Sequence, residues 1–223
     1  MISYAKTFLT TADSKRLTKK DNIIISNGVG LMEKSKDPLH GLNHIFRLKD
    51  SYDEFNKDTG VKTDGGVMLH SIVYHDTFKA ANPRAKSGIR LIWDEIYEGL
   101  GSSKIFQKEA KNVKLDKDLI NQVVYAIRKH SFFNFLPRVT KEAKLLFDLD
   151  ELEFWNLDRF KKSFSVFQFD INRQIEATLA YLKHRTNKGF YFEWSRHKFE
   201  QNKPNFIEEL KRVAYISKHG LRY

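Results

Sequence analysis

The amino-acid sequence predicts an all-α fold, a bundle of helices with additional helices at its C-terminal end. Apolar residues recur at spacings of three and four, for example at Ile45, Leu48 and Tyr52, whereas the alternation typical of strands is scarce. The chain has 223 residues, of which 41% are hydrophobic and 30% charged, so it is long and apolar enough to bury a core. We expect a single domain, with its core at about residues 20–160 and a helical extension at about 157–223.

Four helices are expected in the first part of the chain, and residues typical of helix ends mark their limits. Asp116 is expected to be the N-cap of the fourth helix, which reaches His130. Gly99 and Gly101 are expected to end the third helix, because glycine disfavours a helix interior. The approximate limits of the four helices are residues 41–56, 66–76, 85–100 and 116–130.

The rest of the chain is also expected to be helical. A fifth helix should begin near Thr140, because Pro137 breaks the chain before it. Longer helices should follow at about 157–185 and 204–219, with the turn at 186–189 between them. The sequence shows no internal repeat and no linker that would divide it into two domains.

Composition limits the chemistry and the surroundings of the protein. The chain has no cysteine, which excludes disulfides and thiolate sites, so a metal must be held by nitrogen and oxygen ligands. The N-terminal segment does not resemble a signal peptide and no stretch reaches membrane-spanning length, so we expect a cytoplasmic protein with no membrane partner. The net charge of +11 favours contact with phosphates, but basic residues are spread along the chain. Nucleic acid is therefore an allowed but not a favoured partner, and the oligomeric state stays open.

Histidine and aspartate residues form a candidate metal site. His75 and Asp76 follow the apolar segment 67–74, so two polar side chains stand where a buried helix meets a loop. Burying them without a partner is costly, and imidazole together with carboxylate is a ligand set that divalent cations accept. His44 lies on the preceding helix and can complete such a set.

Two aspartates compete for the last ligand position. Asp148 and Asp150 are two residues apart, so on a helix they point roughly 200° away from each other, and one ion is not expected to bind both. Both residues flank the apolar stripe of Leu145, Leu149 and Leu152, so helical periodicity alone does not choose between them.

Four segments carry a resemblance to a known family. They are residues 40–48 (HGLNHIFRL), 72–76 (IVYHD), 126–132 (AIRKHSF) and 143–152 (AKLLFDLDEL). In this order they are similar to the segments that bring together a histidine, a His-Asp pair and a distant aspartate in the HD superfamily. The segments look like those of small bacterial metal-dependent HD phosphohydrolases, and this resemblance implies an HD-domain helical bundle.

The resemblance implies a metal site and an activity. The activity is hydrolysis of a nucleotide or another small phosphate ester by a metal-activated water. The implied ligands of the divalent ion, which could be Mn, Fe, Mg, Ni or Co, are His44, His75, Asp76 and Asp150, with Asp148 holding a ligand in place. Asp76 and Lys79 are the expected catalytic residues, and Arg47 and His130 are expected to bind the phosphate of the substrate.

Some residues depart from the family pattern. Gly41, Glu151 and Glu153 replace residues that the family often has, and Glu151 in the place of a cation is expected to repel a phosphate. An alternative function follows, a catalytically weak or inactive HD module that binds nucleic acid or a phosphorylated ligand through its basic surface. Lys79 could also be an exposed loop lysine, and His130 could be a cation at a helix end.

Overall fold

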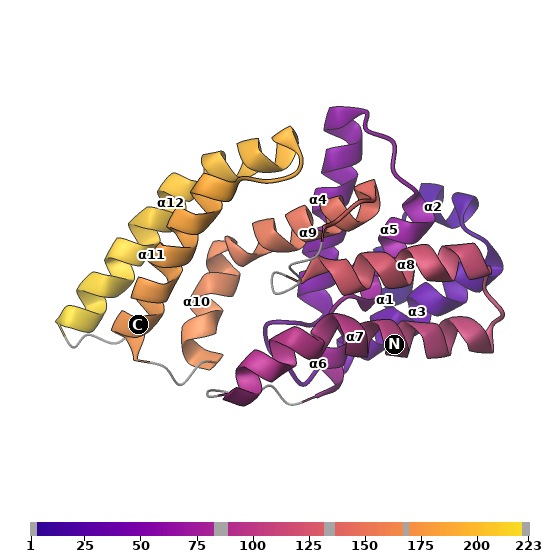
Figure 1. Ribbon diagram of the computed structural model, residues 1–223, viewed down its shortest axis with the longest axis horizontal. Helices are drawn as coiled ribbons and strands as arrows, with labels where there is room; N and C mark the ends of the chain where they lie inside the picture. Colours follow the sequence, from indigo (N-terminus) through magenta and orange to yellow (C-terminus); the bar gives the residue numbers. More distant parts are fainter. Residues whose placement is uncertain (1–3, 83–88, 132–136, 167–169, 220–223) are drawn as a thin grey trace. The chain divides into compact units, whose positions relative to one another are not determined.

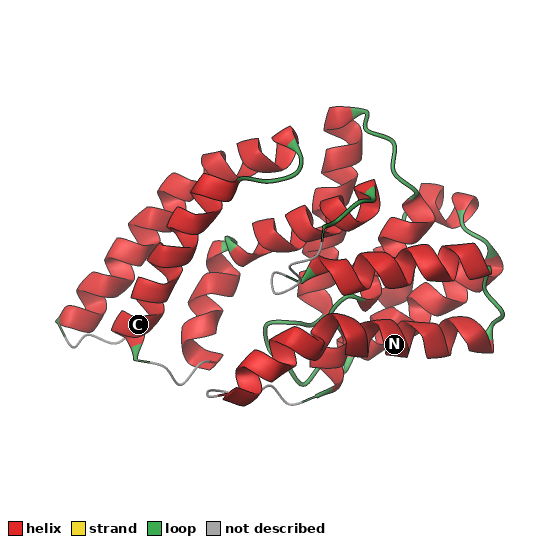
Figure 2. Ribbon diagram, in the orientation of Figure 1, coloured by secondary structure: helices red, strands yellow, loops and turns green. Residues whose placement is uncertain are grey.

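The computed structural model describes residues 4–82, 89–131, 137–166 and 170–219. These residues form helices joined by loops, with no strand among them, so the predicted all-α fold is confirmed (Figure 2). Within the described ranges, no helix combines the length and the apolar character that crossing a bilayer requires.

Contacts divide the chain into two compact units, residues 1–150 and 151–223 (Figure 1). The helices of the first unit are α1 Tyr4–Phe8, α2 Thr11–Arg16, α3 Lys19–Glu33, α4 Leu42–Thr59, α5 Gly65–Tyr74, α6 Thr77–Ala81, α7 Ile89–Asn112 and α8 Lys117–His130. Helix α9, Lys141–Phe154, ends the first unit and begins the second, which continues with α10 Leu157–Val166, α11 Ile171–Lys188 and α12 Glu193–Lys218. That the whole chain is one HD-type domain stays a prediction.

Helix α5 is the central element of the first unit. Every residue of its segment 67–74 is buried, and α5 packs against α3, α4, α7 and α8. An apolar sequence on all sides of a helix is typical of a helix surrounded by others. Because α5 ends inside this bundle, the two residues that follow it, His75 and Asp76, are also buried.

The first turns of α2 and α3 are fixed by capping boxes that the sequence analysis left unread. Thr10 and Asp13 exchange side-chain and backbone hydrogen bonds at α2, and Thr18 and Asp21 do the same at α3. Asp21 also lies 2.9 Å from the ring nitrogen of His70, and both side chains are buried. His70 therefore ties α5 to the start of α3.

The predicted end of the third helix is wrong. Helix α7 continues through Gly99 and Gly101 to Asn112, while the predicted start near residue 85 lies outside the described residues. The two glycines serve close packing. A Cβ atom on Gly101 would lie 2.2 Å from the ring of Phe78, and one on Gly99 would lie 3.0 Å from the carbonyl oxygen of Ile127. They let α7 approach α6 and α8 more closely than alanine would allow.

The limits of the C-terminal helices also differ from the prediction. The expected helix at 157–185 is two helices, because Asp170 caps α11 by accepting hydrogen bonds from the backbone of Asn172 and Arg173. Helix α12 begins at Glu193 and includes Pro204 instead of starting there. Its apolar face packs into the core of the second unit, and this burial offsets the hydrogen bond that a proline removes from a helix.

We predict that the stability of the protein falls in acid because of Asp21. Burial would raise the pKa of this carboxyl, but hydrogen bonds from His70 and Thr18 lower it to about 2. A carboxyl with a depressed pKa stabilises the folded state above the pKa of the unfolded chain, and this contribution is lost as the pH falls toward 2. Asp21→Asn should reduce the free energy of unfolding by about 2 kcal/mol at pH 7, and the difference from the parent should vanish near pH 2.

Urea unfolding at several pH values measures this effect, with the exposed Asp50→Asn as control. A constant difference between parent and Asp21→Asn from pH 7 to pH 2 would contradict the assignment.

We also predict opposite effects for two glycine substitutions. Gly101→Ala should destabilise the protein by about 1 to 3 kcal/mol, because the new methyl group meets Phe78. Gly30→Ala, in α3, should stabilise it by about 1 kcal/mol, because nothing lies within 4 Å of the added Cβ and alanine favours a helix. Thermal unfolding of the two variants checks this, and equal shifts in one direction would contradict the packing role of Gly101.

Candidate metal centre

Four polar side chains lie together at the C-terminal end of α5. His44 lies in the first turn of α4, and His75 is the residue at which α5 ends. Asp76 precedes α6 at its N-cap position, but its side chain makes no capping hydrogen bond, so its carboxylate can face the neighbouring helices. Asp150 comes from α9. Residues far apart in the sequence thus meet at one point of the first unit.

The ligand atoms of these four residues all lie within 4.8 Å of one another. The Nε2 atom of His44 is 3.0 Å from Nε2 of His75, 3.1 Å from Oδ2 of Asp76 and 3.4 Å from Oδ1 of Asp150. The Nε2 atom of His75 is 3.2 Å from Oδ2 of Asp76. Ligand atoms on a tetrahedral or octahedral ion with bonds of about 2.1 Å stand roughly 3.0 to 3.4 Å apart. These distances lie in that range, and the longest, between Nε2 of His75 and Oδ1 of Asp150, is 3.8 Å, so the cluster could hold a divalent ion after a small adjustment of Asp150.

A backbone contact orients His75 for this role. Its Nδ1 atom lies 2.9 Å from the carbonyl oxygen of Ile72, to which the N–H donates. A proton on Nδ1 leaves the lone pair of Nε2 directed at the cluster, as in most metal-binding histidines. The side chains of His44 and Asp76 are each 1% exposed, and both oxygens of Asp76 are buried without a hydrogen-bond partner among the described residues. Buried carboxylate oxygens need a partner, and a cation satisfies them.

The electrostatics of the cluster favour a positive charge. Burial by itself would lower the pKa of His75, but the carboxylates of Asp76 and Asp150 overcome this and raise it to about 10. Burial would raise the pKa of both aspartates, yet the neighbouring histidines hold it well below the usual range. A divalent cation between these groups supplies the charge that they stabilise.

Two further predicted residues lie beside the cluster. The Nε2 atom of His130, at the end of α8, is 3.9 Å from Oδ1 of Asp76. The Nζ atom of Lys79, on α6, is 2.9 Å from Oε1 of Glu98, which is itself 3.4 Å from His130. Lys79 is therefore a partly buried cation next to the cluster and not an exposed loop lysine. His40 is also adjacent, since its Nε2 is 3.7 Å from Oδ2 of Asp76.

Arg47 and Asp148 lie near these groups in the sequence but are not members of the four-residue cluster. Arg47 is half-buried on α4, about one turn beyond His44, and its contact with a substrate stays a prediction. Asp148 is fully buried on α9. The structure groups Asp150 and not Asp148 with the two histidines, and which of the two aspartates binds an ion stays a prediction. That Asp148 holds a ligand in place stays a prediction.

Glu98 was missed by the sequence analysis. It is buried on α7, and its carboxylate joins Asp76 and His130 in a second group whose ligand atoms lie within 4.8 Å of one another. Gly99, the residue after Glu98, was expected to lie at the end of a helix, whereas it lies inside α7. The close approach that Gly99 permits between α7 and α8 instead brings Glu98 to His130.

The structure changes the interpretation of Glu151. Its carboxylate is 2.8 Å from Arg185 and accepts a hydrogen bond of 2.7 Å from the hydroxyl of Tyr181, within the second unit. Glu151 and Arg185 are both buried. The charge of Glu151 is therefore balanced by a buried guanidinium, and the expectation that this carboxylate repels a phosphate is not supported.

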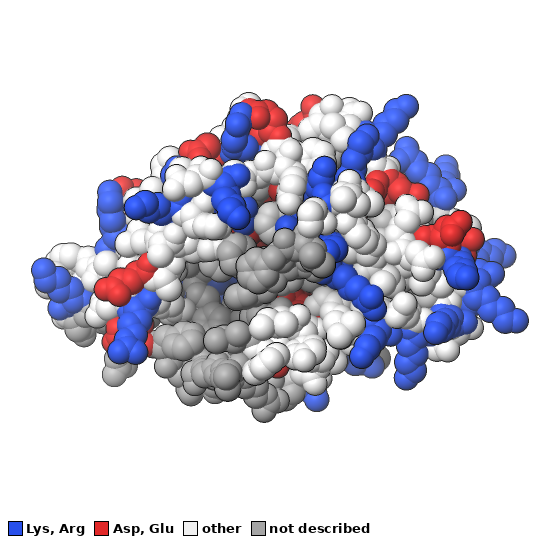
Figure 3. All heavy atoms as spheres, in the orientation of Figure 1, with Lys and Arg blue, Asp and Glu red and all other residues white. Residues whose placement is uncertain are grey.

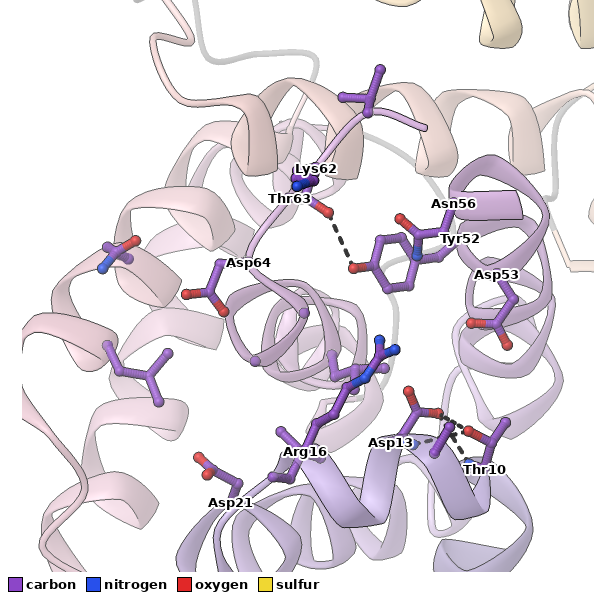
Figure 4. Close-up of a pocket in the computed structure, with 18 of the residues that line it drawn as sticks. Thr10, Asp13, Arg16, Asp21, Tyr52, Asp53, Asn56, Lys62, Thr63 and Asp64 are labelled. Atoms are coloured by element: carbon purple, nitrogen blue, oxygen red, sulfur yellow. Dashed lines mark hydrogen bonds between the residues drawn. The ribbon is translucent and has the colours of Figure 1, made fainter. Parts of the chain in front are cut away.

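The first unit also contains a cavity of about 950 Å³ that none of the predicted site residues lines. Asp13, Asp21 and Asp64 are among its acidic residues, and Figure 4 shows them around the opening beside Arg16. Asp13 and Asp21 belong to the capping boxes of α2 and α3, and Asp64 is the N-cap of α5. Their presence is thus explained by local structure.

Comparison of the chain with protein-family models, with curated proteins and with solved structures found no match. The case for a metal site accordingly depends on the residues and their geometry. The buried histidine and aspartate cluster could hold a divalent ion and is compatible with an HD domain.

We predict that a divalent ion stabilises the folded protein through Asp150. An ion that binds only the folded state should add about 2.7 kcal/mol at a concentration one hundred times its Kd. Thermal unfolding with and without Mn²⁺ should show a clear rise in Tm for the parent chain and for the control Asp50→Ala, and a much smaller rise for Asp150→Ala. An equal rise in all three would exclude Asp150 as a ligand.

Proposed function

We propose that the protein is a metal-dependent phosphohydrolase that acts on a nucleotide or another small phosphate ester. The observation that supports this most is the buried cluster of His44, His75, Asp76 and Asp150, which has the residue types and the sequence order of the HD hydrolases that the chain resembles. Carboxylate and imidazole together suit a metal that activates water, and the cluster has no thiolate that would direct it to other metals.

The four residues of the cluster would hold the ion, which supplies a water of lowered pKa and polarises a phosphoryl oxygen when bound. Asp76 or a neighbouring carboxylate would accept the proton of the attacking water. Asp76 lies at the cluster, and its depressed pKa keeps it ionised at neutral pH. The side chain of Asp150 is 26% exposed, although its Oδ1 atom, which faces the cluster, is buried.

Cationic groups beside the cluster would bind the phosphate. Lys79 contacts Glu98 on one side of Asp76, and His130 lies 3.9 Å from the same aspartate. Arg47 would add a third donor from α4. A phosphate that reaches the cluster would thus meet groups that balance its negative charge. The base, sugar and number of phosphates of the substrate are not selected by these contacts.

A second candidate function follows from the net charge of +11. In this alternative the module binds nucleic acid or a phosphorylated ligand without turnover. Figure 3 shows lysine and arginine side chains distributed along the visible face, with acidic residues between them, and this spread does not form one continuous basic strip. A nucleic-acid groove concentrates its basic residues, and the face that Figure 3 shows has no such concentration.

The experiment measures bound metal and phosphate release in one preparation. The parent chain, purified with added Mn²⁺, is expected to retain the ion and to release phosphate from at least one member of a panel of nucleotides. His75→Ala/Asp76→Ala should lose both properties, because it removes two of the four ligands. The matched control Asp50→Ala/His197→Ala changes an exposed aspartate and an exposed histidine, and it should keep both properties.

Each outcome separates the two candidate functions. Bound metal without turnover, together with nucleic-acid binding that weakens steeply as salt increases, would replace the hydrolase by the binding module. Turnover that persists in the double variant would show that the chemistry lies elsewhere in the chain.

A further inference from the structure

Glu151 directly follows the candidate ligand Asp150, and its buried contacts have no part in the proposed chemistry. Its carboxylate lies 2.8 Å from Arg185 and accepts a hydrogen bond of 2.7 Å from the hydroxyl of Tyr181. Glu151 is 6% exposed and Arg185 is 4% exposed. A buried ion pair is seldom more stable than apolar residues of the same volume, so its presence needs another reason.

Asp150 is the least enclosed of the four candidate ligands. The side chains of His44, His75 and Asp76 are at most 1% exposed, whereas that of Asp150 is 26% exposed. Its Oδ1 atom lies 3.4 Å from Nε2 of His44 and 3.8 Å from Nε2 of His75. The corresponding atoms of the other three residues are 3.0 to 3.2 Å apart. The position of Asp150 therefore depends more on its own helix than on the side chains around it.

The rotation of α9 about its axis sets where the carboxylate of Asp150 lies. The tip of a side chain is about 5 Å from the axis of its helix, so a rotation of about 10° moves it by about 1 Å. A metal–ligand distance tolerates a deviation of only about 0.2 Å. The apolar contacts of the buried Leu146 and Leu149 are not directional, so they limit this rotation less closely than hydrogen bonds do.

Arg185 and Tyr181 supply directional contacts to α9. They are four residues apart on α11, so their side chains lie on the same face of that helix. One guanidinium nitrogen of Arg185 donates to the carbonyl oxygen of Gly189 at 3.0 Å, while the other donates to Glu151. The ring of Tyr181 stacks on that of Trp155, with 5.5 Å between the ring centroids. The carboxylate of Glu151 thus meets two donors whose own positions are fixed.

We infer that Arg185 and Tyr181 are positioning residues of the metal centre, which act through Glu151 and α9 to set the place of Asp150. The inference rests on the proposed function, and it gives a role to the glutamate that stands where the family pattern has a cation. Consecutive residues of a helix differ in direction by about 100°, so one rotation of α9 serves both the contacts of Glu151 and the position of Asp150.

The test compares Mn²⁺ affinity with stability in the full chain. Glu151→Met/Arg185→Met replaces the pair by apolar side chains, which keeps the burial but removes the directional contacts. This variant should unfold at about the same temperature as the parent but bind Mn²⁺ about tenfold more weakly, as measured from the electron paramagnetic resonance signal of free Mn²⁺. Glu193→Met/Arg196→Met removes an exposed pair of the same residue types and should leave the affinity unchanged.

A double-mutant cycle tests whether the pair acts through Asp150. In a chain that already carries Asp150→Ala, Glu151→Met/Arg185→Met should cause no further loss of affinity. An equal loss with and without Asp150 would overturn the positioning role. Parent affinity in a folded Glu151→Met/Arg185→Met chain would overturn it as well.

Tyr181→Phe tests the same role with the ion pair intact, so it decides the question even where the double variant does not fold. It removes only the hydroxyl that donates to Glu151, and it should weaken Mn²⁺ binding about threefold. Parent affinity in Tyr181→Phe would overturn the inference and leave the proposed function intact. If the parent chain itself bound no Mn²⁺, the proposed function and the inference would both be overturned.

Discussion

The structure of the first unit depends on how the buried charge of Asp76 is balanced. An ionised carboxylate inside a helical bundle is costly unless charged or hydrogen-bonding partners surround it. His40, His44, His75 and His130 approach this one side chain from α4, α5 and α8 and the segment before α4. Packing alone does not explain these buried polar residues, because apolar residues of the same volume would make the folded state at least as stable. Cation binding gives it a reason.

The other helices of the first unit hold Asp76 in its place. Helix α5 is apolar on all sides, so it sits inside the other helices and carries His75 and Asp76 into the interior. Gly99 and Gly101 let α7 approach its neighbours, and this approach places Glu98 beside His130. Capping boxes at α2 and α3 and the pair of Asp21 with His70 fix the helices around α5. Local capping, close packing and the polar cluster thus support the same arrangement.

The sequence predicted the parts of this arrangement that depend on local signals. The apolar run of α5, the cap at Asp116 and the order of His44 and the His-Asp pair can be read from the sequence, and the helical spacing of apolar residues predicted the all-α fold. The sequence does not distinguish Asp148 from Asp150, because both flank the same apolar stripe of α9. The structure groups only Asp150 with the histidines. Glu98 could not be found, since glycine allows close contact as readily as it ends a helix. The neutralisation of Glu151 depends on Arg185, a residue 34 positions away.

The most direct test of the central claim is the position of the metal itself. Crystals grown with Mn²⁺ and measured at the manganese absorption edge should show an anomalous peak between His44, His75, Asp76 and Asp150, with protein ligands at about 2.1 to 2.3 Å. A strong peak there would establish that the buried cluster is a metal centre. A well-ordered structure with Mn²⁺ in the crystal and no anomalous density at these four residues would contradict the account.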